Sequence, residues 1–302
     1  MTIEAVRDLL MRLSASTRAI AALGLALDER VKGAPLDPAI KTEIDHVLAA
    51  LGASEMLDEI NPAELKPVLA EIRMTLLQAA KLLLSPTSPG WTHSEIDILQ
   101  STGEFSAGFP LSLKQTMARH EGLAKRLESP DAAFLDVGVG VGGISIAMAR
   151  AWPMLRVVGI DPWRPSLDIA HENVKTAGLH TRIELREQTA QGLSDAKAFD
   201  LAFFPSFFIA EAVIGTALER VYHALRPGGW ISFVIQNPGP DPLTASLARL
   251  RTVLWGGHPW TPGEAESLLN QAGYVQVQTL PSGPTAPGVQ IIGRRSLEEA
   301  GA

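Results

Sequence analysis

The sequence predicts an α/β protein in which a doubly wound, mostly parallel seven-stranded sheet ends in a C-terminal antiparallel hairpin and follows an N-terminal all-α domain. Three observations lead to this prediction. The first ~85 residues carry apolar side chains at helical spacing, whereas from residue 132 short apolar runs alternate with helical stretches. Near the C-terminus, two strand-like runs are joined by a proline–glycine loop without a helix, which favours a hairpin.

Residues 1–90 are the predicted helical domain. One apolar stripe runs from Val6 to Ile20, and Asp37-Pro38 is typical of an N-cap followed by proline in the first helical turn. Residues 91–130 mix polar, aromatic and glycine residues, so we expect a linker or lid that includes a helix over 111–127. Residues 131–302 are the predicted ligand-binding domain.

The ligand-binding domain opens with five buried strands that are separated by helices, which is typical of a parallel sheet. A capped helix begins at Thr261-Pro262 and ends near Gly273, ahead of the hairpin. The strands are expected over residues 132–138, 155–161, 182–187, 199–205 and 230–236, and the hairpin over 274–280 and 288–296.

Composition excludes several classes of function. The 302 residues include no cysteine, which excludes disulfides and thiolate metal sites and fits a cytoplasmic protein. The net charge of −7 disfavours nucleic-acid binding. No uninterrupted apolar run reaches the ~18–20 residues of a membrane span, so we expect no membrane partner.

The segment LDVGVGVGG, residues 135–143, lies at the first strand–helix turn, where doubly wound sheets bind ligands. Its glycines satisfy the dinucleotide pattern G-x-G-x-x-G, but Asp136 would repel a pyrophosphate and suits a ligand with cationic groups. Asp161 ends the second strand, where its carboxylate can accept hydrogen bonds from both hydroxyls of a ribose. A nucleoside with a cationic, phosphate-free tail is S-adenosylmethionine.

Four segments in order, FLDVGVGVGG, VVGIDP, FDLAFF and ALRPGGWISFV, resemble the successive motifs of the class I S-adenosylmethionine-dependent methyltransferases, which have a Rossmann-like fold. The resemblance covers residues ~130–295. The helical front end resembles the appended domains of small-molecule methyltransferases, which often form homodimers through these helices.

The resemblance implies a role in cofactor binding for residues of all four segments and for the turn after the third strand. Asp136 would lie near the methionine amino group, Asp161 would hold the ribose, and Phe204 with Pro205 would face the transferred methyl. The full implied set is Asp136, Gly138, Gly140, Gly142, Asp161, Pro162, Trp163, Gln188, Thr189, Phe204 and Pro205. Gln188 or Thr189 stands where the family often has an acidic residue, so the adenine would lose a charged acceptor.

The acceptor is expected to be a small molecule with an oxygen, nitrogen or carbon nucleophile, because the segment after the fourth strand, FFPSFFIAEA, lacks the Asn/Asp-Pro-Pro motif of DNA and glutamine methyltransferases. It also lacks the His-Asp pair of plant-type O-methyltransferases and the carboxylates of metal-dependent enzymes, so no metal is expected. Candidate bases are His93 and His258. The candidate walls of the acceptor site are Trp91, Phe105, Phe109, Phe207, Phe208 and Trp260.

Two alternatives keep the cofactor but change the outcome. A non-methylating enzyme could direct a nucleophile to another carbon of the sulfonium, for example by intramolecular cyclisation that releases methylthioadenosine. A non-catalytic protein could retain the fold only to bind S-adenosylmethionine. Product analysis separates these alternatives from methyl transfer, which yields S-adenosylhomocysteine.

Overall fold

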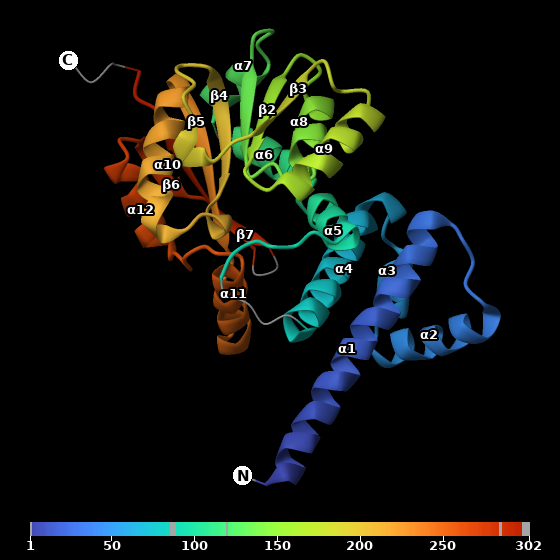
Figure 1. The fold of residues 1–302 in the computed structure, drawn as a ribbon. Coiled ribbons are helices and arrows are strands. Elements are labelled where there is room, and N and C mark those ends of the chain that lie inside the picture. The colour runs from blue at the N-terminus through green and yellow to red at the C-terminus, as the bar shows by residue number, and fades with distance from the viewer. Residues whose placement is uncertain (1, 85–88, 119, 284–285, 298–302) are drawn as a thin grey trace. The chain divides into compact units, whose positions relative to one another are not determined.

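The computed structural model describes residues 2–84, 89–118, 120–283 and 286–297. The chain divides into two compact units (Figure 1). The helical unit comprises Met1–Pro86 and Glu95–Ser106, and the sheet unit comprises Thr87–Ser94 and Ala107–Ala302. The predicted segment 91–130 is therefore shared between the two units, while the limits of the predicted domains stay a prediction.

The helical unit packs around a small apolar core that includes Leu27, Ile44, Leu48, Leu65 and Leu69. Proline at the start of α2 and the side chain of Asp37, which accepts from two backbone amides there, set the beginning of that helix as the sequence predicts. Its helices are α1 (Ile3–Lys32), α2 (Pro38–Ala50), α3 (Ser54–Asp58), α4 (Pro62–Leu84) and α5 (Ile96–Ser106).

The apolar side chains in the first half of α1 are exposed. The buried residues of α1 are Gly24, Ala26 and Leu27, all in the second half of the helix. By length and composition alone α1 could cross a membrane, a criterion that a signal sequence near an N-terminus also meets. The sequence-based expectation counted uninterrupted apolar runs, which Arg12 and Arg18 break.

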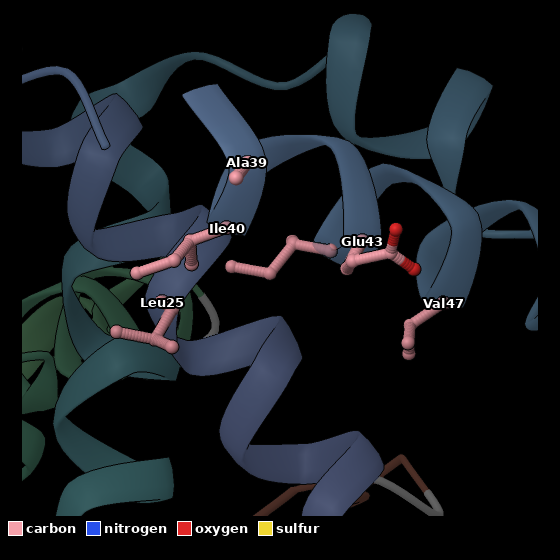
Figure 2. Close-up of a pocket in the computed structure, with 6 residues that line it drawn as sticks. Leu25, Ala39, Ile40, Glu43 and Val47 are labelled. Atoms are coloured by element: carbon pink, nitrogen blue, oxygen red, sulfur yellow. The ribbon is translucent and has the colours of Figure 1, made fainter. Parts of the chain in front are cut away.

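A shallow depression of about 430 Å³ lies between α1 and α2. Figure 2 shows Leu25, Ala39, Ile40 and Val47 around it, with Glu43 as a polar neighbour. None of the residues predicted to bind cofactor or acceptor lines it.

The sheet unit contains a seven-stranded sheet in the order β3-β2-β1-β4-β5-β7-β6. Strands β1 to β5 are parallel, β7 is antiparallel to β5, and β6 pairs with β7 as the predicted hairpin. The strands are β1 (Ala133–Val137), β2 (Arg156–Asp161), β3 (Ile183–Glu187), β4 (Phe199–Pro205), β5 (Leu225–Gln236), β6 (Val275–Thr279) and β7 (Gly288–Arg294). The predicted fold class is confirmed.

Helices cover both faces of this sheet (Figure 1). One face packs against α10 and α12 and the other against α6 to α9, because the alternating side chains of the buried strands are apolar on both sides. The helices are α6 (Phe109–Met117), α7 (Glu121–Leu127), α8 (Gly143–Ala151), α9 (Arg164–Thr176), α10 (Glu211–Ala224), α11 (Pro242–Leu254) and α12 (Pro262–Gln271), with the 3-10 turns η1 (Ala190–Gly192) and η2 (Ser206–Phe208).

Strand order places the candidate site. The chain leaves β1 toward β2 and returns to β4 on the other side of β1, so the carboxyl ends of β1 and β4 form the topological switch point. Consistent with this, Pro205 at the end of β4 lies beside Gly138 at the end of β1. Because β1 to β4 are parallel, the cofactor residues predicted after these strands share one edge of the sheet.

Candidate functional site

The turn between β1 and α8 is built from glycines in left-handed conformations. Gly138, Gly140 and Gly142 have φ of 69°, 56° and 86°, values that residues with a Cβ rarely adopt. The amides of Gly138 and Val139 donate to the carbonyl of Ile160 at 2.8 and 3.0 Å, which ties the turn to β2. Because these glycines have no Cβ, a ligand at this edge of the sheet can approach the backbone of the turn closely.

Gly159 in the middle of β2 is needed for the shape of this turn. A Cβ there would lie 2.5 Å from Cγ2 of Val139, whose side chain is buried beneath the loop. A glycine inside a strand is a sequence signal of close backbone approach, and Gly159 is a site residue that this signal could have identified.

Asp161 ends β2 with its carboxylate fixed by two backbone amides. Oδ2 accepts from Gly140 at 2.9 Å and Oδ1 accepts from Trp163 at 2.8 Å. Each carboxylate oxygen can accept more than one hydrogen bond, so both remain able to accept from a pair of ribose hydroxyls. The two amide contacts also fix the carboxylate before any ligand arrives.

Asp136 lies at the end of β1 and is only 1% exposed. Its Oδ2 accepts from the hydroxyl of Ser145 on α8 at 2.6 Å. Its Oδ1 is buried and has no hydrogen-bond partner among the described residues. Burial, with a smaller contribution from the charge of Asp161, raises the pKa of Asp136 to about 7.

The carboxylates of Asp136 and Asp161 make this edge of the sheet a favourable binding site for a cation. Burial also raises the pKa of Asp161, although the amides of Trp163 and Gly140 oppose the shift. Ionised carboxylates that lack enough compensation are stabilised by a positive ligand and repel a phosphate. The orphaned Oδ1 of Asp136 therefore fits a ligand that carries an ammonium group, as S-adenosylmethionine does.

The other predicted cofactor residues lie around the same edge, with one exception in orientation. Pro162 is exposed, and the side-chain nitrogen Nε2 of Gln188 donates to the carbonyl of Gly192 at 2.9 Å, which leaves the side-chain oxygen of Gln188 as an acceptor. Thr189 is half-buried and is the N-cap residue that precedes η1. The ring of Phe204 is fully buried in the core and stacks on Phe233, so only its backbone can contribute to the site.

Trp163 makes a contact that the sequence did not predict. Its indole nitrogen donates to the carbonyl of His93 at 2.7 Å. The amide of Gly90 in turn donates to the carbonyl of Leu254 at the end of α11. Residues 90–94 therefore run between the cofactor edge at β2 and the end of α11, and we call them the strap.

Four aromatic side chains gather where β4 ends. Trp91 of the strap packs edge-on against Phe208 and Trp255, with ring centroids 5.0 and 5.8 Å apart. Trp255 also stacks on Phe208 at 4.9 Å, and Phe207 packs against both. The sequence predicts three of them, Trp91, Phe207 and Phe208, as walls of the acceptor site. Trp255, the C-cap residue of α11, was not predicted, because its contacts with Trp91 and Phe208 join segments far apart in the chain.

Two further predicted acceptor residues, Phe109 and Trp260, pack elsewhere in the sheet unit. Phe109 packs against Phe203 and Phe134 on the face covered by α6, which makes it part of the core. Trp260 is half-buried and packs against the core on the other face of the sheet, which α10 and α12 cover. Phe105 belongs to α5 of the helical unit.

The two candidate bases have different surroundings. His93 is half-buried in the strap, and its ring lies 4.8 Å from that of Trp91. His258 lies in the loop between α11 and α12, with Nδ1 2.9 Å from Oε2 of Glu211. Among the residues that the structure describes, no group of three His, Asp or Glu side chains is placed to hold a metal ion.

The strand order, the left-handed glycine turn and the buried carboxylates at the ends of β1 and β2 are features of class I S-adenosylmethionine-dependent methyltransferases. Residues 134–229 match the family model described as methyltransferase domain. This range begins in β1 and ends in β5, so it contains the glycine turn and both carboxylates.

Comparisons with individual proteins agree. The chain is 28% identical over 173 residues to ubiquinone biosynthesis O-methyltransferase of Azorhizobium caulinodans, covering 54% of this chain and 67% of the relative. Other curated relatives are matched over about a third of their length or less.

Solved structures share the fold over nearly the whole chain. An O-methyltransferase family protein from Burkholderia thailandensis is 16% identical with a TM-score of 0.65, and covers 97% of this chain and 99% of its own. PigF, solved with SAH, is 19% identical with a TM-score of 0.63 over 97% and 99%. Residues 134–229 are a methyltransferase domain whose cofactor is S-adenosylmethionine, and the fold shared with these solved structures extends over the N-terminal helical region.

Proposed function

We propose that this enzyme transfers the methyl group of S-adenosylmethionine by in-line displacement to an oxygen of a small, partly apolar molecule. The observation that carries the proposal is the aromatic cluster of Trp91, Phe207, Phe208 and Trp255 at the end of β4, on the same sheet edge as the glycine turn. Flat apolar faces favour a planar acceptor. The O-methyltransferase named among the relatives supports an oxygen nucleophile.

In this proposal the residues of the site bind the cofactor, orient the acceptor and remove its proton. Asp136 and Asp161 hold the cofactor by its ammonium group and its ribose, and the bound sulfonium supplies an electrophilic methyl. The aromatic cluster excludes water and orients the acceptor, and such alignment can lower a barrier by about 7–11 kcal/mol. His258 is the proposed base for a protonated acceptor hydroxyl, because its Nδ1 lies 2.9 Å from the carboxylate of Glu211, which can orient the ring.

The experiment is a product analysis with purified protein. The protein is incubated with S-adenosylmethionine and a panel of simple phenols, catechols and hydroxyquinones, and the products are identified by mass spectrometry. Methylated phenol together with S-adenosylhomocysteine supports the proposal. Methylthioadenosine would indicate the non-methylating alternative, and cofactor binding without any product from the panel would favour the binding protein.

Two curated relatives have names that place their acceptors in a protein and in RNA. The same preparation is therefore offered a release-factor protein and a structured RNA with tritiated S-adenosylmethionine. Label in either macromolecule, with none in the phenols, would refute a small-molecule acceptor.

We also propose that two copies pair through α1 and that the dimer is cytoplasmic. Eight apolar side chains of α1 are each at least 39% exposed, among them Leu10 and Leu13, and a surface of this kind is typical of an interface. Sedimentation of the Leu10→Glu/Leu13→Glu variant should show a monomer where the wild type shows a dimer. A wild-type monomer, or flotation of the wild type with lipid vesicles, would refute this pairing.

A further inference from the structure

The loop that carries His258 is fixed against the end of β4. Gly257 lies so close to Phe207 that an added Cβ would be 2.6 Å from the backbone of Phe207. The amide of Gly257 donates to the carbonyl of Thr252 at 3.1 Å, and Trp255 stacks on Phe208. The residue that follows Gly257 is therefore held beside η2, at the sheet edge where the acceptor is proposed to bind.

The imidazole of His258 is held from one side by a carboxylate. Its Nδ1 lies 2.9 Å from Oε2 of Glu211, the first residue of α10. The ring of Trp260 packs against the imidazole at 4.2 Å. Glu264 also interacts electrostatically with His258, but its carboxylate already accepts hydrogen bonds from the backbone amide and the hydroxyl of Thr261.

We propose that Glu211 is a positioning residue that holds His258 as the base of the methyl transfer, an inference that rests on the proposed function. A carboxylate at Nδ1 fixes the neutral tautomer with its proton on that nitrogen and leaves the lone pair on Nε2. Nε2 is then the atom that accepts a proton from the acceptor.

The step balances without any further reactant. A lone pair of the acceptor oxygen forms the new O–C bond, and the S–C bond breaks with its electron pair left on sulfur. The hydroxyl proton moves to Nε2 of His258 and passes from there to water. Glu211 keeps its charge throughout and stabilises the imidazolium.

The simpler interpretation is an ordinary surface ion pair, since the side chains of His258 and Glu211 are 35% and 62% exposed. Exposed pairs of this kind contribute little to the stability of the folded protein. A melting temperature cannot separate the two interpretations, whereas the tautomer of the imidazole and the rate of methyl transfer can.

The first test requires no acceptor. Long-range ¹H–¹⁵N spectra of the seven histidines are recorded for the full chain, and His258 is assigned from the His258→Gln variant. We expect the Nδ1–H tautomer in the wild type, its retention in Glu211→Gln, and its loss in Glu211→Leu. Glu219→Leu on the exposed side of the same helix is the matched control. A wild-type imidazole that carries its proton on Nε2 would overturn the positioning role.

The second test uses whichever phenol of the panel is methylated. We expect kcat to fall at least 30-fold in His258→Gln and about tenfold in Glu211→Leu, while KM for S-adenosylmethionine changes less than twofold. Wild-type kcat in either variant overturns the inference even if methyl transfer itself is established. If no phenol is methylated but the tautomer pattern is found, the proposed function fails while the positioning contact stands.

Discussion

Cofactor binding should release a proton from Asp136. Burial raises the pKa of this carboxyl from 3.8 to about 7, so at pH 7 about half of the unliganded molecules carry a proton there. An ammonium group beside Oδ1 requires the ionised form. We therefore expect S-adenosylhomocysteine to displace about half a proton per site at pH 7 and close to one at pH 6.

The same linkage sets the pH dependence of affinity. Only about one molecule in eleven has an ionised Asp136 at pH 6, against ten in eleven at pH 8, so affinity should be about tenfold weaker at pH 6. The assay is isothermal titration calorimetry in buffers of different ionisation enthalpy, where the slope of the observed enthalpy counts the released protons. Asp136→Asn is the control that subtracts ionisation of the ligand, because asparagine can still accept from Ser145. Equal slopes in wild type and variant would refute this reasoning.

The stability of the folded protein should fall as the pH rises, whereas the affinity for the cofactor should increase. A carboxyl whose folded pKa is raised holds its proton more tightly when folded, so its stabilising contribution is complete below the unfolded pKa near 4 and is lost as the pH rises toward 7. The shift of Asp136 corresponds to at most about 4 kcal/mol. Urea unfolding of Asp136→Asn should therefore show a more stable protein than the wild type at pH 8, with the difference shrinking toward pH 4. A variant less stable at pH 8 would contradict the assigned cause of the shift.

Three further predictions concern the surroundings of the site. Asp161→Ala should weaken S-adenosylhomocysteine binding at least tenfold by calorimetry while circular dichroism shows a folded protein, and unchanged affinity would remove Asp161 from the ribose role. Trp163→Phe keeps an aromatic plane but loses the donor to His93, so hydrogen exchange of the strap should speed up severalfold with the sheet unaffected; unaltered exchange would show that this contact does not hold the strap. Gly257→Ala should destabilise the protein by about 1–3 kcal/mol because its Cβ has no space, whereas Gly263→Ala, with open space around it, should be neutral or slightly stabilising in thermal denaturation; equal melting temperatures would contradict the tight packing of the loop.

The sheet could be predicted from sequence because each of its signals is local. Short apolar runs, capped helices and the loop between the last two runs fix the alternation of elements, and parallel strands then have few possible arrangements. The capping box at Thr261 and the N-cap at Asp37 are found where the sequence places them.

The cofactor edge was also accessible from sequence, since Asp136 and Asp161 are positioned by the ends of neighbouring strands. What sequence could not provide is the set of contacts between distant segments. The pairing of Glu211 with His258, the hydrogen bond from Trp163 to the strap, and the placement of Trp255 in the aromatic cluster all join residues far apart in the chain. The core position of Phe204 escaped prediction because strand alternation leaves open which face receives a given ring.

The central claim is that the carboxylates of Asp136 and Asp161, at the ends of β1 and β2, bind a nucleoside with a positively charged tail. A crystal structure of the protein with S-adenosylhomocysteine tests it most directly. We predict the ligand's amino group at Oδ1 of Asp136, directly or through one water, and its ribose hydroxyls at the carboxylate of Asp161. A ligand bound elsewhere, or either carboxylate directed away from it, would contradict the claim.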